Sequence, residues 1–110
     1  MASNLRQWQI WKCRPPGFAR DHWFVILSGQ ERLDHEHRLQ VNGLACYKLQ
    51  GDPKKLDVRL NGADGFDGPT ACQCDFIFVL DKTTLHSCLG AVTWERQQSI
   101  KSKLKEVLRL

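Results

Sequence analysis

The sequence predicts a mainly β protein with helices, in which a small barrel of about five to seven strands is followed by a C-terminal amphipathic helix. Short runs rich in aromatic and β-branched residues recur along the chain, and glycine- or proline-containing turns separate them. The last segment instead repeats its apolar residues at the spacing of a helix. A chain of 110 residues has room for one modest core, so we expect a single domain over residues 1–110.

Two strands are expected in the N-terminal part of the chain. Residues 8–12 carry bulky apolar side chains and lead into the turn sequence RPPG. Residues 22–28, with the sequence HWFVILS, are too short and too dense in aromatic and β-branched residues to be a helix. We expect them to form a central strand buried on both sides, and we interpret the polar residues 29–38 as the loop that leaves it.

Three further strands are expected in the middle of the chain. Residues 41–49 and 56–60 form the first two, because the turn sequences QGDP and NGADG flank the second one. The run TACQCDFIFVL predicts a single long strand over residues 70–80. Several short strands of this kind, closed by one helix, are typical of a small SH3-like β-barrel.

Alternation along this long strand predicts two different faces. Gln73 and Asp75 fall on one face, so their side chains are expected to stand side by side. Cys72, Cys74 and Phe76 fall on the other face, and we expect the two cysteines to be buried as small hydrophobic residues.

The chain is expected to end in one strand and one helix. Residues 85–92 form a weak strand candidate that contains Gly90, and Thr93 is suited to cap the N-terminus of the following helix. The helix carries its apolar residues at i, i+4, i+7 and i+8, which predicts one stripe that docks on the sheet. This stripe consists of Ile100, Leu104, Val107 and Leu108.

The composition narrows the class of protein. Hydrophobic residues make up 42% of the chain and charged residues 25%, as in ordinary soluble globular proteins. No apolar run approaches the roughly 18 to 20 residues that a membrane span needs. The N-terminal sequence MASNLRQWQIW lacks the apolar core of a signal peptide, so we expect a cytoplasmic protein.

The net charge of +4 is compatible with an anionic partner. The positive excess is concentrated in the last helix, where cations also complement the helix dipole or simply face solvent. Both interpretations remain open at this point.

Cysteine usage argues against a disulfide-bonded secreted domain, because the five cysteines are odd in number and irregularly spaced. We expect reduced thiols. The sequence DHEH at residues 34–37 has ligand-type side chains, but it lies in the most polar stretch and is interpreted as a solvated loop. No second pair of ligands accompanies Cys72 and Cys74, so no metal and no other cofactor is expected.

Four tryptophans are candidates for base stacking or for the core. Trp8, Trp11 and Trp23 lie on expected strands, and Trp94 opens the last helix. In a small domain such residues more often form the core, and we expect this for all four.

The segments RQWQIWKC, HWFVILS and PTACQCDFIFVLDKTTLHSCLG together resemble the PemK/Kid/MazF family of plasmid-maintenance and toxin-antitoxin toxins. In that family a strand with an Arg-Cys-Asp or similar triplet precedes an aspartate-lysine turn, a glycine-containing strand and the closing helix. The corresponding triplet here is Gln-Cys-Asp at residues 73–75, followed by Asp81, Lys82 and Gly90. Toxins of this family are typically metal-independent endoribonucleases that cleave single-stranded messenger RNA with the RNA's own 2′-hydroxyl as nucleophile.

The resemblance implies three catalytic positions. Asp75 matches the family's strand aspartate, Gln73 stands where the family has arginine, and His22 stands where a basic residue opens the second strand. Histidine titrates near neutral pH and so can act as acid or base. Structural alternatives stay open for both residues: His22 as a hydrogen-bonded residue at a strand start, and Asp75 as a loop cap or a partner of Lys82.

The resemblance also implies substrate-binding positions. Cys46, with Tyr47 next to it, falls near the family's threonine or serine at the end of the third strand. Arg14 and Arg20, in the loop before His22, can supply the positive charge that Gln73 lacks.

Three functions are therefore expected to compete. The first is a toxin-like endoribonuclease (mRNA interferase) of a type II toxin-antitoxin system. Such a toxin is homodimeric through the barrel face and terminal helix, and an acidic antitoxin neutralises it. The second is a catalytically weakened or inactive family member that binds RNA or a protein target, as the gyrase-inhibiting branch does. The third is a free-standing structural domain.

Overall fold

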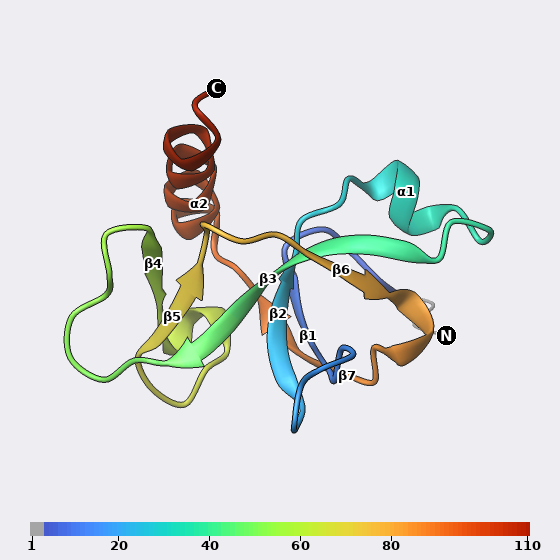
Figure 1. Ribbon diagram of the computed structural model, residues 1–110, viewed down its shortest axis with the longest axis horizontal. Helices are drawn as coiled ribbons and strands as arrows, with labels where there is room; N and C mark the ends of the chain where they lie inside the picture. Colours follow the sequence, from blue (N-terminus) through green and yellow to red (C-terminus); the bar gives the residue numbers. More distant parts are fainter. Residues whose placement is uncertain (1–3) are drawn as a thin grey trace.

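The fold is built on one curled antiparallel sheet (Figure 1). The computed structural model describes residues 4–110, so the first three residues of the expected domain lie outside it. Within this range the sheet has seven strands, in the order β4-β5-β3-β2-β1-β7, and β6 pairs with the first half of β3. The strands are β1 (Gln9–Cys13), β2 (His22–Ile26), β3 (Gln40–Lys48), β4 (Asp57–Leu60), β5 (Thr70–Gln73), β6 (Phe78–Asp81) and β7 (Ser87–Ala91). The mainly β architecture with a C-terminal helix is confirmed.

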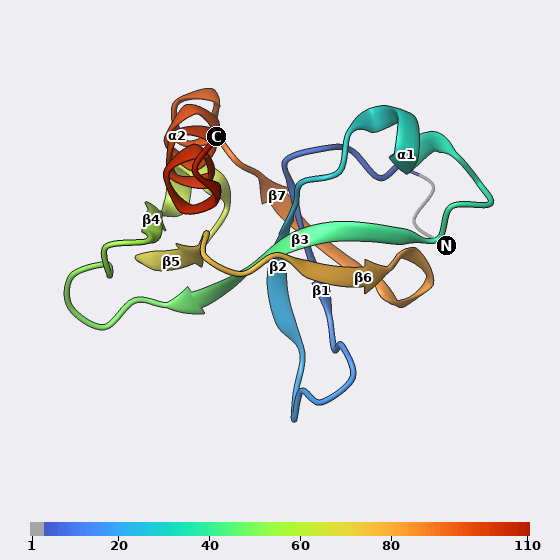
Figure 2. The ribbon, with the colours of Figure 1, turned by 45° about the horizontal axis from the view of Figure 1, so that its top comes forward.

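Two helices cover opposite ends of this sheet (Figure 2). The short helix α1 (Gln30–Asp34) lies near the start of β3, and the longer helix α2 (Trp94–Leu108) stands beside β4 and β5. Single 3-10 turns at Gly62–Asp64 and Lys82–Thr84 complete the secondary structure. Among the described residues no helix combines the length and the apolar character that crossing a bilayer requires.

Strand β2 is the central strand that the sequence predicts. It pairs with β1 on one side and β3 on the other, and its consecutive residues Phe24, Val25 and Ile26 are fully buried. Successive side chains of a strand point to opposite faces, so both faces of β2 must be covered. Two hydrophobic clusters do this: Val25 belongs to the cluster under α2, and Phe24 and Ile26 belong to the cluster under α1.

Each helix docks through one buried residue. Ile100 of α2 is completely buried in the first cluster, and Leu33 of α1 is 7% exposed in the second. The Thr93 side chain accepts a hydrogen bond from the Arg96 backbone N–H at 3.4 Å, which confirms the expected N-cap. The polar stretch after β2 therefore contains a short helix as well as loop residues, because Leu33 anchors it to the core.

The single strand expected over residues 70–80 is wrong, because the structure divides it into β5 and β6. Cys46 of β3 pairs with Cys72, and Gly43 pairs with Phe78. Between these two pairs β3 spans three positions, whereas the segment from β5 to β6 spans six. Residues 74–77 therefore leave the ladder as an excursion between β5 and β6, which lets both strands follow the curled strand β3.

The excursion separates Phe76 from the buried face that Cys72 and Cys74 share. Cys72 and Cys74 are buried as expected, but Phe76 is 59% exposed because the alternation ends with β5. The Cys74 backbone N–H donates to the Leu56 carbonyl at 3.2 Å and holds the start of the excursion beside β4.

Two expectations for α2 are corrected. Trp94 is 70% exposed and lies outside the core, since an offset of six positions along the helix turns it to another face than Ile100. Leu108 is 49% exposed, because the last turn of α2 extends past the sheet (Figure 1). The other three tryptophans are partly buried and pack against the two clusters.

All five cysteines are free thiols, as expected. Four are buried and Cys88 is exposed. Burial raises the pKa of Cys13 to about 11, so this thiol is protonated at neutral pH. No group of three or more histidine, cysteine or carboxylate side chains within residues 4–110 could hold a metal ion.

Candidate nucleic-acid interface

Tyr47 and Gln73, which lie 26 positions apart in the sequence, line one pocket of about 260 Å³. Tyr47 lies near the end of β3 and Gln73 is the last residue of β5, where it pairs with Asp57 of β4. Both side chains are partly buried. The lining is mixed: it includes the polar residues Lys48, Gln50, Asp52 and Lys54 as well as Leu49 and Ala71.

His22 extends this region toward the loop between β1 and β2. Its ring lies 5.3 Å from the Tyr47 ring and 4.9 Å from the Phe18 ring, measured between centroids. The imidazole is partly exposed, and no hydrogen bond from it is found among residues 4–110. The structure therefore places His22 among aromatic rings and does not support the hydrogen-bonded structural role.

Five rings form a continuous series, which we call the aromatic strip. Beyond Phe18 the series continues to Phe78 at 5.5 Å and from there to Phe76 at 4.7 Å. None of the five rings is fully buried, and Phe76 is the most exposed. Partly exposed aromatic rings are surfaces on which unstacked bases can stack, and Phe76 offers the most accessible ring of the five. The members of the strip are Tyr47, His22, Phe18, Phe78 and Phe76.

Asp75 lies next to Phe76 in the excursion, and its side chain is exposed. No hydrogen bond or ion pair of this carboxylate is found within residues 4–110. The expected pairing with Lys82 is absent there, because the Lys82 ammonium is buried under α1 instead. The side-by-side arrangement with Gln73 also fails, since β5 ends at Gln73 and the alternation does not reach Asp75.

Cys46 does not face solvent. It is 5% exposed, belongs to the first hydrophobic cluster, and its Sγ donates to the Leu44 carbonyl at 3.9 Å. Strand alternation places Cys46 on the face of the first cluster and Tyr47 on the opposite face, where it packs against the edge of the second cluster. The expectation that Cys46 contacts substrate is therefore corrected, and Tyr47 is the member of this pair that lines the pocket.

Two arginines border the aromatic strip on the loop that carries Phe18. Arg14 and Arg20 are exposed, and neither has an ion-pair partner within residues 4–110. The RPPG sequence makes the expected turn, in which Gly17 has φ of 87° and the Phe18 N–H donates to the Pro15 carbonyl. Uncompensated guanidinium groups beside aromatic rings suit a phosphate backbone.

A histidine that the sequence analysis missed lies beside the same loop. The Nε2 of His86 lies 3.1 Å from Asp21 Oδ2, and its Nδ1 lies 3.1 Å from Ser87 Oγ. The His86 backbone N–H donates to Lys12 of β1, which brings β7 next to the loop that follows β1. Asp21 and His86 are 65 residues apart, so no local motif links them. A carboxylate-oriented imidazole is suited to proton transfer.

Comparisons with solved structures show that this fold is known. No protein-family model and no curated protein matches the chain. An endoribonuclease in complex with its cognate antitoxin from a mycobacterial species superposes with a TM-score of 0.78 at 23% identity, covering 100% of this chain and 97% of that one. The Mycobacterium tuberculosis toxin MazF-mt6 superposes with a TM-score of 0.77 at 14% identity, covering 93% and 97%.

A MazE-MazF complex from Deinococcus radiodurans gives a TM-score of 0.73 at 14% identity and covers 98% of both chains. The likeness thus spans nearly the full length of this chain and of its structural neighbours. The protein has the fold of the MazF toxins, as the resemblance of its sequence segments implies.

Proposed function

We propose that this protein is a toxin-like, metal-independent endoribonuclease of a type II toxin-antitoxin system, and that its substrate is single-stranded RNA. The aromatic strip, bordered by unpaired arginines, is the observation that carries this proposal. The fold shared with solved endoribonuclease toxins supports it. We extend the proposal to the whole chain as one domain acting in the cytoplasm.

Binding in this proposal uses stacking and charge. Splayed bases stack on the exposed rings of the strip, each contributing about 1–3 kcal/mol. Arg14 and Arg20 contact phosphates on the loop side, and Lys48 and Lys54 do so at the pocket shared by Tyr47 and Gln73. The surface reads single strands, because paired bases would not expose their faces to the rings.

Cleavage in this proposal is an internal transesterification. Asp75 takes the proton from the 2′-hydroxyl, the 2′-oxygen attacks phosphorus, and the bond to the 5′-oxygen breaks. His22 in its protonated form gives a proton to the departing 5′-oxygen, and Gln73 donates a hydrogen bond to a phosphate oxygen. The products are a 2′,3′-cyclic phosphate and a 5′-hydroxyl, and no metal enters the reaction.

The amide at Gln73 makes slow cleavage the expected behaviour. An amide donates a hydrogen bond to the developing phosphorane but brings no charge. Losing one such donor commonly costs about two to three orders of magnitude in rate. In this proposal Arg14 and Arg20, exposed on the loop before His22, supply part of the missing charge.

A second candidate is a module that binds RNA or a protein target without cutting RNA. Three observations favour it: Gln73 is uncharged, the Cys46 thiol is buried, and the Asp75 carboxylate has no cationic partner among the described residues. The aromatic strip would then hold the strand while no group accelerates its cleavage.

Partners of α2 form the last part of the proposal. Leu104, Leu108 and Leu110 line an apolar groove of about 480 Å³ together with Lys101 and Lys105. Leu108 and Leu110 are 49% and 87% exposed. We assign this side of the molecule to homodimer contacts and to an acidic antitoxin, whose charge complements that of the helix.

The deciding experiment incubates purified protein with single-stranded RNA in the presence of EDTA and maps the ends of the products. The proposal expects cyclic phosphate ends, with Asp75→Ala and His22→Ala abolishing cleavage. Asp67→Ala is the matched control, because Asp67 is an exposed carboxylate outside the strip and the pocket. Binding without cleavage would support the second candidate. If the protein neither bound nor cleaved RNA, the remaining interpretation would be a structural domain.

A further inference from the structure

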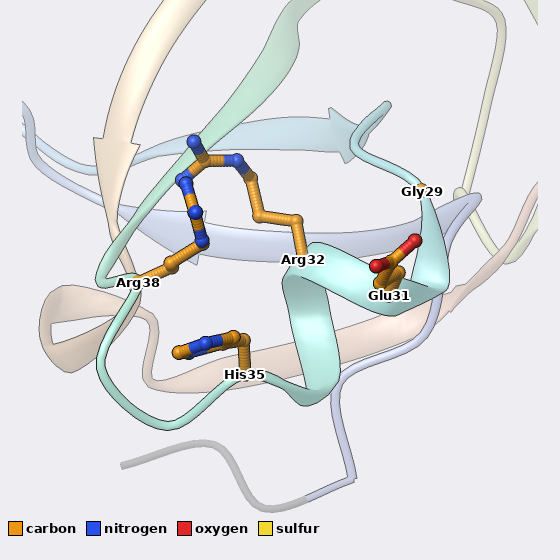
Figure 3. A pocket seen from close by; sticks show the side chains of 5 residues that line it. All are labelled: Gly29, Glu31, Arg32, His35 and Arg38. Atoms are coloured by element: carbon orange, nitrogen blue, oxygen red, sulfur yellow. The ribbon is translucent and has the colours of Figure 1, made fainter.

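A second pocket, remote from the aromatic strip, lies against α1. It has a volume of about 550 Å³ and is lined by Gly29, Glu31, Arg32, His35 and Arg38 (Figure 3). The guanidinium groups of Arg32 and Arg38 point toward one another across it, and the His35 ring lies on the helix side. Three nitrogen-rich side chains therefore converge on one open cavity.

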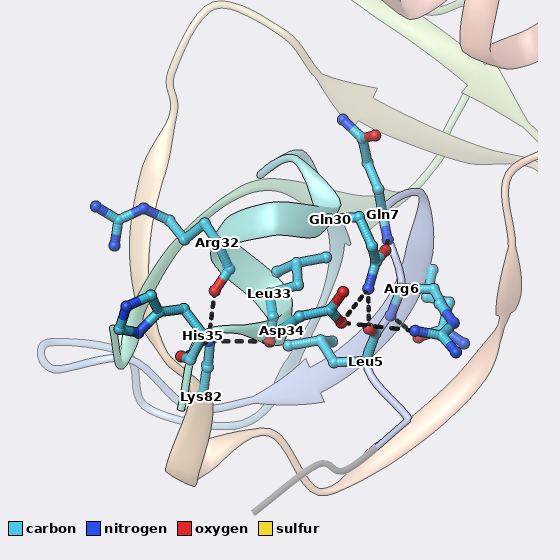
Figure 4. Close-up of polar contacts among 10 residues, drawn as sticks. Leu5, Arg6, Gln7, Gln30, Arg32, Leu33, Asp34, His35 and Lys82 are labelled. Atoms are coloured by element: carbon cyan, nitrogen blue, oxygen red, sulfur yellow. Dashed lines mark hydrogen bonds and ion pairs between the residues drawn. The ribbon is translucent and has the colours of Figure 1, made fainter. Parts of the chain in front are cut away.

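Hydrogen bonds hold the Arg32 guanidinium and the backbone of α1 in place. Arg32 Nη1 donates to the Gln40 carbonyl at 3.0 Å, which ties the guanidinium to the start of β3. The backbone of α1 is held from below by Lys82, whose Nζ donates to the carbonyls of Arg32, Leu33 and His35 at 2.7, 3.1 and 2.9 Å (Figure 4). A five-residue helix thus presents its side chains from a rigid base.

The two guanidinium groups of this pocket have no ion-pair partner among the described residues, although the Glu31 carboxylate also lines the cavity. Asp34 of α1 instead pairs with Arg6 at 3.7 Å, and the carboxylate of Glu31 is set apart from the two guanidinium groups, on the Gly29 side of the helix (Figure 3). The buried Lys82 ammonium adds a further positive charge beneath the helix. Like charges held close together favour an anion between them.

We propose that this pocket binds a phosphate oxyanion, with Arg32 and Arg38 as a two-sided guanidinium clamp and His35 as an additional donor. Planar guanidinium groups donate paired hydrogen bonds that match the oxygens of a phosphate. The His35 Nδ1 accepts from the His37 N–H at 3.3 Å, so the proton sits on Nε2, where it can be donated.

The phosphate belongs to a larger molecule in this proposal. Arg32 also lines a neighbouring pocket of about 200 Å³ with Gln40, Asn42 and Val79, so space continues beyond the clamp. A nucleotide and the backbone of an RNA strand share the required chemistry. The site lies at the start of β3, whereas Tyr47 lies near its end, so this inference does not depend on the proposed cleavage site.

The test is an NMR titration of isotope-labelled protein with inorganic phosphate, with sodium chloride at equal ionic strength as the reference. The proposal expects saturable shifts of the arginine side-chain N–H signals of Arg32 and Arg38. Arg38→Gln should weaken phosphate binding roughly tenfold, as loss of one charge-assisted pair implies. Arg59→Gln is the matched control, because this exposed arginine on β4 lines neither pocket. No saturable shift, or equal binding by the two variants, would overturn the proposal.

A second arm identifies the source of the phosphate. A single-stranded RNA without terminal phosphates is added, and competition with inorganic phosphate at Arg38 assigns the site to a nucleic-acid backbone. If only inorganic phosphate and mononucleotides bind, the site takes a free phosphate monoester. Both outcomes support an oxyanion site. RNA cleavage is scored separately, so a failure of the proposed nuclease leaves this result unaffected.

Discussion

Replacing Lys82 with methionine tests how a buried ammonium holds α1 in place. Lys82 is 2% exposed and directs all three of its N–H groups to carbonyls at the end of α1. Methionine keeps most of the apolar stem but donates no hydrogen bond. The bond to the Leu33 carbonyl is buried, whereas the bonds to Arg32 and His35 are partly accessible to water.

The magnitude follows from this difference in accessibility. The buried Leu33 carbonyl loses its donor at a cost of about 1–3 kcal/mol, and the two accessible carbonyls recover part of their bonding from water. Removing the buried charge returns some of its desolvation cost. We expect Lys82→Met to lower the free energy of unfolding by about 2–4 kcal/mol, which lowers the urea midpoint by roughly 1 to 2 M.

Urea unfolding monitored by circular dichroism measures this change, and hydrogen exchange at the Leu33 amide reports whether α1 opens locally. Lys55→Met is the control, since Lys55 is exposed and a surface substitution should stay within about 0.5 kcal/mol. If Lys82→Met behaved like this control, the three hydrogen bonds would contribute nothing measurable and the reasoning would be refuted.

Burial also gives Lys82 a pH signature. It lowers the pKa of this lysine below its ordinary value of 10.5. Between the lowered pKa and 10.5 the unfolded chain therefore binds more protons than the folded one, so the contribution of Lys82 to the free energy of unfolding rises with pH. Lys82→Met should remove this rise. If the free energy of unfolding of the variant rose with pH as steeply as that of the wild type, the lowered pKa of Lys82 would be contradicted.

Three further predictions concern the candidate interface. Gln73→Arg should raise the RNA cleavage rate by about two orders of magnitude, because it restores a charged donor at the phosphate; single-turnover kinetics measure it, and Gln50→Arg in the same pocket controls for added charge. Phe76→Ala should weaken RNA binding roughly tenfold while the melting temperature stays unchanged, as fluorescence anisotropy and thermal unfolding would report. His86→Gln should remove one inflection from the pH–rate profile if His86 transfers a proton, whereas a merely structural role would shift stability and leave the profile intact.

Local patterns were sufficient to predict several elements. The dense apolar run of β2 predicts a central strand, and Thr93 predicts the start of α2 within the sequence itself. These features depend on neighbouring residues only, so no tertiary information is needed. The break between β5 and β6 depends on the curl of β3, which no periodicity in residues 70–80 reveals.

In the candidate site, too, some features could be predicted from the sequence and others depend on tertiary contacts. The sequence predicted Gln73, Tyr47 and His22 as site residues, and the structure brings these three together through one pocket and one ring contact. The exposure of Phe76 follows from the break between β5 and β6, and the burial of Cys46 follows from the pairing of β3 with β5. The pairing of Asp21 with His86 depends on a contact between β7 and β1 that joins distant parts of the chain.

Because Asp75 lies in the excursion between β5 and β6, its position does not depend on the pairing of the strands. Asp75 and Phe76 make no rung of the ladder with β3 and are exposed, whereas Cys74 anchors the start of the segment in the first cluster. Lengthening or shortening this segment by one residue would move the carboxylate and the Phe76 ring while the two flanking strands stay paired. Changes confined to Asp75 and Phe76 can therefore alter substrate preference in proteins with this fold while β5 and β6 keep their pairing with β3.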